Sequence, residues 1–144
     1  MSTPINNKIL VSDVMITPDH FPVVKKSTLF KETLEEMGKY SLGIVCIVDN
    51  ENKLCGILTD GDIRRKLLKV QKPFSAFFVD DALLHSITEP ICCKANDLLF
   101  KAVTIMGGKK VWDLPVIDND RKLLGLLHLH PAVKALLEKF EENA

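Results

Sequence analysis

The sequence predicts an α/β (α+β) fold in which two β-α-β-β-α repeats pack as one pseudo-two-fold module. Three observations favour this fold. The chain has 144 residues, 47% of them apolar, which is enough for a packed interior. Residues 29–68 align with residues 98–137 without a gap, at a constant offset of 69. In each copy, short apolar runs alternate with amphipathic segments, as strands alternate with helices.

The internal match rests on residues of several types rather than on leucines alone. An Asp-Asn pair, a Lys-Leu pair and a glycine recur at fixed spacing: Asp49-Asn50 and Asp118-Asn119, Lys53-Leu54 and Lys122-Leu123, Gly56 and Gly125. Each copy would leave one face of its sheet apolar, so two copies can cover each other. We therefore expect the first repeat at residues 10–70, a connector at 71–85 and the second repeat at 86–140.

The first copy opens with an apolar stretch at 22–24 that we expect to form a strand. Ser27 and Thr28 follow, and their hydroxyl groups suit the N-terminus of a helix. The helix after them carries an apolar stripe at three- and four-residue spacing, made by Phe30, Leu34, Met37 and Tyr40. Gly38 suits the C-terminal end of this helix.

Two strands and a second helix complete the first copy. Residues 43–48 are apolar and rich in β-branched side chains, which predicts a strand buried on both faces. Turn residues at 49–52 lead to a hairpin partner at 53–58. The helix that follows carries the apolar residues Ile63, Leu67 and Leu68.

The second copy repeats this order. A strand is expected at 91–93, and a helix should begin after Asn96-Asp97 and stop at Gly107-Gly108. Strands at 114–117 and 122–127 enclose a turn at 118–121. The apolar residues of the two helices are Leu99, Val103 and Met106 in the first, and Val133, Leu136, Leu137 and Phe140 in the last.

The connector at 71–85 is too apolar for a free linker, because it contains Pro73 and the aromatic residues Phe74, Phe77 and Phe78. We favour an extra helical turn packed on the module. The alternative is a docking surface for another chain.

Composition argues against several classes of function. Lys plus Arg and Asp plus Glu each number 19, whereas a nucleic-acid binder would show a basic surplus. Residues 1–8 do not read as a signal peptide, and no apolar run reaches the ~20 residues of a membrane span. The four cysteines include no Cys-x-x-Cys pair, so reduced thiols and a cytoplasmic location are expected. The sequence contains neither a catalytic triad pattern nor a Walker-type phosphate loop, so these motifs give no support to an enzyme.

A candidate ligand site lies where residues 56–65 pass from the third strand into the second helix. The first turn of a helix presents free N–H groups and the positive end of the dipole, which suits an anion. Thr59 can bind a phosphate oxygen, and Asp62 can accept hydrogen bonds from the two hydroxyls of a ribose. Arg64 and Arg65 add cations suited to phosphate or carboxylate. The alternative is an ordinary helix cap, in which Asp60 and Asp62 complement the dipole.

Residues 56–62 have the pattern Gly-h-h-Thr-x-x-Asp, in which h is a hydrophobic residue and x is any residue. This pattern, inside a β-α-β-β-α repeat, resembles the ligand motif of cystathionine-β-synthase (CBS) domains. The opening Asp13-Val14-Met15, with Thr17-Pro18 after it, resembles the start of a CBS repeat. The strings Gly-Ile-Leu-Thr-Asp-Gly-Asp-Ile-Arg-Arg and Leu-Leu-Gly-Leu-Leu-His-Leu-His resemble the C-terminal CBS pair of the isomerases that act on arabinose 5-phosphate. The resemblance covers residues 10–138.

This resemblance implies a nucleotide ligand in a cleft between the repeats, and a homodimer. Carried over residue by residue, Thr59 would hold a phosphate or sugar oxygen and Asp62 the ribose hydroxyls. Val24 and Ile44 would line the base, and Thr17 is a further candidate contact. The implied ligands are adenosine nucleotides such as AMP or ATP and, from the isomerases of Kdo and lipopolysaccharide biosynthesis, CMP or CMP-Kdo. We favour the cytidine-linked ligand.

The expected function is regulation of an attached or partner sugar-phosphate isomerase. We expect no catalysis by this chain, because the isomerase domain is absent from it. The alternative is a structural dimerisation module that binds no small molecule.

The second copy departs from the ligand motif, since His128 aligns with Thr59 and Pro131 with Asp62. Proline supplies neither a carboxylate nor an N–H group, so we expect one dominant ligand site per chain. His128 and His130 lie at strand spacing, but two ligands fall short of the four of a closed zinc site. We therefore expect no metal, and expect both histidines to line the interface between repeats and donate to a phosphate or carboxylate.

Overall fold

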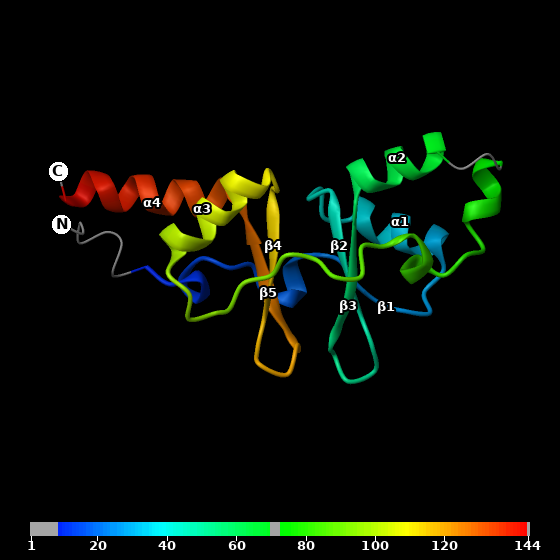
Figure 1. Cartoon of the computed structure of the whole chain (residues 1–144), viewed down its shortest axis with the longest axis horizontal. Coiled ribbons are helices and arrows are strands. Elements are labelled where there is room, and N and C mark those ends of the chain that lie inside the picture. The colour runs from blue at the N-terminus through cyan, green and yellow to red at the C-terminus, as the bar shows by residue number, and fades with distance from the viewer. Residues whose placement is uncertain (1–8, 70–72, 144) are drawn as a thin grey trace.

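A computed structural model describes residues 9–69 and 73–143. Two small sheets lie between helices at the two ends of the molecule (Figure 1). The first sheet has the order β1-β2-β3, with β1 parallel and β3 antiparallel to β2. The second sheet pairs β4 with β5 antiparallel. The strands are β1 (Val23–Lys25), β2 (Ile44–Val48), β3 (Leu54–Thr59), β4 (Asp113–Ile117) and β5 (Leu123–His128).

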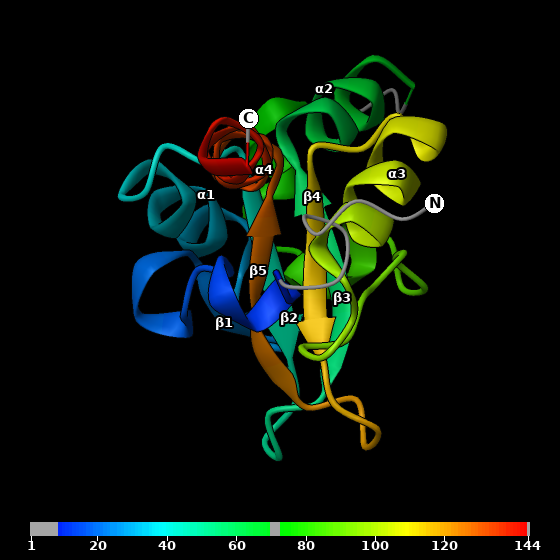
Figure 2. The same cartoon turned by 90° about the vertical axis from the view of Figure 1, so that its left-hand side faces the viewer.

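Each sheet carries two helices on its outer side, so that the sheets face each other across the middle of the molecule (Figure 1). Viewed from one end, the strands of the two sheets overlap (Figure 2). The helices are α1 (Phe30–Gly38), α2 (Asp60–Lys69), α3 (Leu99–Lys109) and α4 (Leu129–Asn143). This is the predicted pseudo-two-fold arrangement, with all four long helices in the expected order. The buried strand predicted at 43–48 is confirmed, because every residue of β2 is buried.

The starts of α1 and α3 differ from the prediction. Their N-cap residues are Leu29 and Leu98, and neither helix has a side-chain cap from the serine, threonine, asparagine or aspartate that precedes it. Backbone carbonyls from distant segments accept the first N–H groups instead. Phe30 N–H donates to the carbonyl of Asp80 at 2.8 Å, and Leu99 N–H donates to that of Ile9 at 2.9 Å. Tertiary contacts thus satisfy the groups that a cap would satisfy.

The predicted glycine stop is correct for α1 and wrong for α3. Helix α3 continues through Gly107 and Gly108 to Lys109. The left-handed residue after it is Lys110, with φ of 57°. The aligned residue of the first copy, Ser41, has φ of 56°. The turns of the two hairpins show the same agreement, with φ of 65° at Asn52 and 64° at Arg121. The repeat is therefore visible in the backbone even where side chains differ.

The strand expected at 91–93 is absent from the second sheet, as far as the described residues go. Cys93 forms one parallel bridge with Val116 and no longer ladder develops. The hairpin registers still correspond, because Ile44 lies opposite Thr59 and Asp113 lies opposite His128.

Each repeat is completed by the segment that precedes the other one. Ile16 exchanges backbone hydrogen bonds of 2.8 and 2.9 Å with Leu126 on β5, so residues 9–16 pack on the second repeat. Ile87 exchanges bonds of 2.9 and 2.8 Å with Ile57 on β3, so residues 79–87 pack on the first. Val11 is fully buried in the core of the second repeat. Contacts therefore cross the sequence boundaries expected between the repeats.

The connector forms helical turns packed on the module, as favoured from the sequence. Two short 3-10 helices cover Phe74–Phe77 and Ala82–His85. Phe77 is 1% exposed, and its ring lies 6.2 Å from that of Phe30 on α1. Residues 71 and 72 lie outside the described residues.

Candidate functional site

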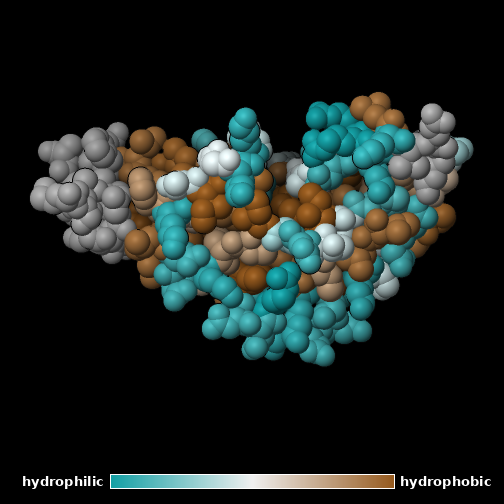
Figure 3. All heavy atoms as spheres, in the orientation of Figure 1, coloured by the Kyte–Doolittle hydropathy of each residue, from teal (hydrophilic) through white to brown (hydrophobic). Residues whose placement is uncertain are grey.

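A cavity of about 510 Å³ lies between the two repeats, at the junction of β3 and α2. In the space-filling view, apolar side chains are visible in the notch between the two halves of the molecule (Figure 3). The first repeat contributes Leu42, Gly43, Ile44, Ile57, Thr59, Asp60, Gly61, Asp62, Arg64 and Arg65, with Ile87 packed against it. The second repeat contributes Lys110, Val111, Trp112 and Asp113. The cavity therefore has an apolar floor and polar walls from both repeats.

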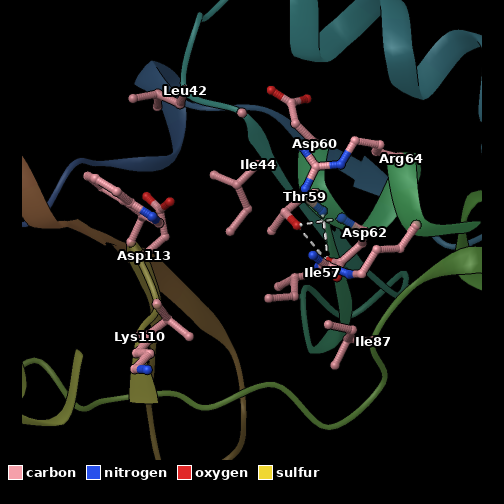
Figure 4. A pocket seen from close by; sticks show the side chains of 15 residues that line it. Leu42, Ile44, Ile57, Thr59, Asp60, Asp62, Arg64, Ile87, Lys110 and Asp113 are labelled. Carbon is pink, nitrogen blue, oxygen red and sulfur yellow. Dashed lines mark hydrogen bonds and ion pairs between the residues drawn. The ribbon is translucent and has the colours of Figure 1, made fainter. Parts of the chain in front are cut away.

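Thr59 and Asp62 form a reciprocal cap at the start of α2 (Figure 4). Asp62 Oδ2 accepts hydrogen bonds from the Thr59 hydroxyl at 2.7 Å and from the Thr59 N–H at 3.2 Å. The Asp62 N–H donates to Thr59 Oγ1 at 3.1 Å. These residues stabilise the helix, and the same two side chains border the cavity.

The second carboxylate oxygen of Asp62 is held by an exposed partner. Arg65 Nη2 donates to Asp62 Oδ1 at 2.7 Å, and the Arg65 side chain is 64% exposed. An exposed pair of this kind contributes less than about 1 kcal/mol. A ligand hydroxyl can therefore take the place of Arg65 at Oδ1 while the cap to Thr59 remains.

Gly43 provides the space that Asp60 occupies. A Cβ added at Gly43 would lie 3.0 Å from Asp60 Oδ2, and Gly43 has φ of +73°, which side chains other than glycine rarely adopt. The Asp60 N–H donates to the Gly43 carbonyl at 3.0 Å. This contact fixes the first residue of α2 against the start of β2.

The wall from the second repeat contains a buried carboxylate. Asp113 begins β4, its side chain is 8% exposed, and its Oδ1 lies 2.8 Å from His128 Nδ1. Burial raises the pKa of Asp113, and the hydrogen bond with His128 acts in the opposite direction. Beside it, Trp112 is 70% exposed at the cavity.

Sequence reasoning missed this wall and part of the floor. The missed side chains are Leu42, Ile57, Ile87, Lys110, Val111, Trp112 and Asp113. One signal was present, because Asp113 aligns with Ile44, and so a charged residue stands where the first copy has an apolar strand residue. Trp112 is also the single tryptophan of the chain.

Six of the candidate residues named from the sequence border this one cavity: Ile44, Thr59, Asp60, Asp62, Arg64 and Arg65. Val24 lies elsewhere, on the side of β1 that packs with the cluster around Phe30 and Met37. Thr17 is exposed beside Ile16, which pairs with the second repeat.

The two histidines do not share a strand face. His128 ends β5, whereas His130 is the second residue of α4 and is exposed, because the chain turns into the helix between them. His128 bonds to Asp113 at the interface of the repeats, and neither histidine borders the cavity. Within the described ranges, no three His, Cys, Asp or Glu side chains are grouped to hold a metal ion.

Comparison with known proteins agrees with this architecture. The CBS domain family matches residues 11–69 and 80–138, which together make up most of the chain and lie at the same offset as the internal repeat. The chain belongs to the CBS domain family. It is a CBS pair, the class of regulatory module that the sequence predicts.

Relatives of this CBS pair include longer proteins. It is 32% identical over 125 residues to arabinose 5-phosphate isomerase KdsD of Pseudomonas aeruginosa, covering 87% of the chain and 37% of that protein. It is 36% identical over 124 residues to an uncharacterized protein of Helicobacter pylori strain J99, covering 85% of the chain and 36% of that protein. The chain thus spans little more than a third of these relatives.

Solved structures share the fold of the CBS pair. CBSX2 in complex with AMP has a TM-score of 0.79 and 26% identity, covering 91% of this chain and 98% of that one. A CBS domain-containing protein of unknown function from Bacillus anthracis has a TM-score of 0.82 at 18% identity, covering 93% of this chain and 96% of that one, which shows the fold alone. In the part of the chain that the structure describes, no helix has the length and apolar character needed to cross a membrane.

Proposed function

We propose that this CBS pair binds a nucleotide in the cavity between its repeats and that occupancy regulates a sugar-phosphate isomerase, attached or in a partner chain. The observation that carries the proposal is the composition of the cavity. An apolar floor, a carboxylate with one oxygen paired to an exposed arginine, and two arginines beside a helix N-terminus lie within one space. Its volume of about 510 Å³ is in the range of small-molecule sites.

The chemistry of the walls suggests how a nucleotide would lie. The base would pack on the apolar side chains of Ile44, Ile57 and Ile87. A ribose hydroxyl would donate to Asp62 Oδ1 in place of Arg65. Arg65, once released, and Arg64 would then pair with the phosphate near the first turn of α2.

Two nucleotide classes fit this proposal. CBSX2, which shares the fold, was solved with AMP, and this supports an adenosine nucleotide. The similarity to arabinose 5-phosphate isomerases supports CMP or CMP-Kdo, a product that would report back to its pathway. Either ligand regulates only if it binds two states of the isomerase domain with unequal affinity.

A structural dimerisation module is the second candidate, and one observation favours it. Leu68 on α2 and Leu137 on α4 occupy aligned positions and are 82% and 59% exposed. Both helices lie along the same edge of the molecule (Figure 1). A closed two-fold homodimer could bury both leucines, and it is compatible with ligand binding in the cavity.

A thermal-shift screen of the purified chain tests the proposal, using CMP, CMP-Kdo, AMP, ADP, ATP and S-adenosylmethionine. Ligand at about a hundred times its dissociation constant adds roughly 2.7 kcal/mol, a rise of several degrees. The rise should vanish in Asp62→Ala and persist in Asp120→Ala, which removes an exposed carboxylate from the β4–β5 turn. No rise with any nucleotide would leave the dimerisation module as the better explanation.

A further inference from the structure

Asp113 departs from the apolar character of the strand that it begins. The next four residues of β4 are buried, and the aligned residue of the first repeat is Ile44. Burying a carboxylate costs free energy unless hydrogen bonds compensate for it. A side chain that is 8% exposed and borders a cavity therefore calls for a partner.

Within the described residues, one of the two carboxylate oxygens of Asp113 has a hydrogen-bond partner. Oδ1 lies 2.8 Å from His128 Nδ1, and the other oxygen accepts no hydrogen bond from any residue in the described ranges. His128 fixes the carboxylate from the side of β5, because these two residues lie opposite each other in the hairpin. Because Asp113 lines the cavity, its second oxygen is available as an acceptor for a ligand.

The two walls of the cavity differ in the surroundings of their charges. One wall has Arg64 and Arg65 together with Asp60 and Asp62, at the N-terminus of α2, and the other has the buried carboxylate of Asp113 near Lys110. Figure 4 shows Asp113 and Lys110 on the wall opposite Thr59 and Arg64. A carboxylate repels phosphate, whereas the guanidinium groups of Arg64 and Arg65 lie beside the N-terminus of α2. A nucleotide that puts its phosphate at the arginines therefore directs its base towards Asp113.

We propose that Asp113 and Trp112 select the base of the nucleotide. Asp113 accepts a hydrogen bond from an exocyclic amino group, and the exposed indole of Trp112 stacks on the ring. The site then prefers adenine and cytosine to hypoxanthine and uracil, whose oxygen in the same position would face the carboxylate as a second acceptor. This inference rests on the proposed nucleotide binding and names the ligand class within it.

Titration calorimetry with two matched pairs, AMP against IMP and CMP against UMP, tests the selection. The unmodified chain should bind the amino member of its preferred pair about tenfold or more tightly than the oxo member, since a hydrogen bond to a charged group is at stake. Asp113→Asn keeps the shape and can donate to the oxo group, so the preference should narrow to about threefold or reverse. Asp120→Asn makes the same change at an exposed site and should leave the preference intact.

Trp112→Ala should weaken both members of a pair by the same factor, because every base has a face to stack. Equal affinity of the unmodified chain for the amino and oxo members would overturn the selection and leave nucleotide binding standing. An Asp113→Asn variant that binds all four nucleotides more tightly by one factor would also overturn it, since that result assigns the phosphate to the Asp113 wall. Absence of binding by all four would overturn the proposed function itself.

Discussion

A methyl group added at Gly125 would lie 2.7 Å from the carbonyl oxygen of Ile16 and 2.8 Å from Met15 Sδ. Both distances are shorter than contacts of real Cβ atoms, so Gly125→Ala must push the N-terminal segment away from β5. Overpacking of this kind costs about 1–3 kcal/mol. The two hydrogen bonds between Ile16 and Leu126 add roughly 0.5–1.5 kcal/mol each if they break. We expect a loss of about 3 kcal/mol in the free energy of unfolding.

Urea denaturation followed by circular dichroism measures this loss, which corresponds to a fall of roughly 10 °C in Tm. Gly107→Ala is the matched control, because a Cβ there meets nothing within 4 Å and the residue is in α3. The control should gain about 0.5–1 kcal/mol, since alanine favours the helix. If Gly125→Ala unfolded at the midpoint of the unmodified chain, the packing of residues 9–16 on the second repeat would be refuted.

Three further predictions concern the core and the buried ionisable groups. Phe77→Ala should lower the free energy of unfolding by about 3–5 kcal/mol, because the Phe77 side chain is 1% exposed and packs against α1. A loss below about 1 kcal/mol in urea denaturation would contradict the packing of the connector on the module. The raised pKa of Asp113 means that its carboxyl group binds a proton more tightly in the folded chain than in the unfolded chain. The stability that this proton contributes is complete below the ordinary pKa of 3.8, and it is lost as the pH rises through the pKa of the folded chain. Asp113→Asn should therefore match the unmodified chain at acid pH and exceed it at neutral pH, and equal urea midpoints at neutral pH would argue against the cost of burial. Burial raises the pKa of Cys93 to about 12 and that of Cys46 further still, so a thiol reagent should label both only after unfolding; rapid labelling of the folded chain, counted by mass spectrometry, would show that they are accessible.

The elements that could be predicted from the sequence are those whose local pattern agrees with their burial. The run at 44–48 forms a strand because its apolar side chains are buried on both faces. The stretch at 91–93 has the same type of residue, but only Cys93 finds a strand partner. A strand of three residues depends on the register of its neighbour, which the pattern of its own residues does not contain.

Helix ends show the same limit. Ser27 and Thr28 have the chemistry of a cap, yet the carbonyl of Asp80 accepts the first N–H of α1. That carbonyl belongs to the connector, so its arrival depends on the tertiary fold. Local preference placed the helix within two residues but could not identify which group would cap it.

In the candidate site, the residues that are close in sequence could be predicted, and those that tertiary packing brings in could not. Thr59, Asp62 and Arg65 are close in sequence, and their spacing alone was enough to bring them to one helix turn. Trp112 and Asp113 reach the cavity only because the second repeat packs across it. The replacement of an apolar strand residue by an aspartate was visible in the alignment of the two copies, and its meaning depends on the opposite wall.

Isothermal titration with AMP and with CMP tests the central claim most directly, using the unmodified chain, Asp62→Ala and Asp120→Ala. Nucleotide binding in the cavity predicts one nucleotide per chain, with binding lost in Asp62→Ala and retained in Asp120→Ala. The stability of Asp62→Ala should fall by only about 1 kcal/mol from the lost cap, which shows that the variant still folds. Binding of either nucleotide that is unchanged in Asp62→Ala, or no binding to the unmodified chain, would contradict the account.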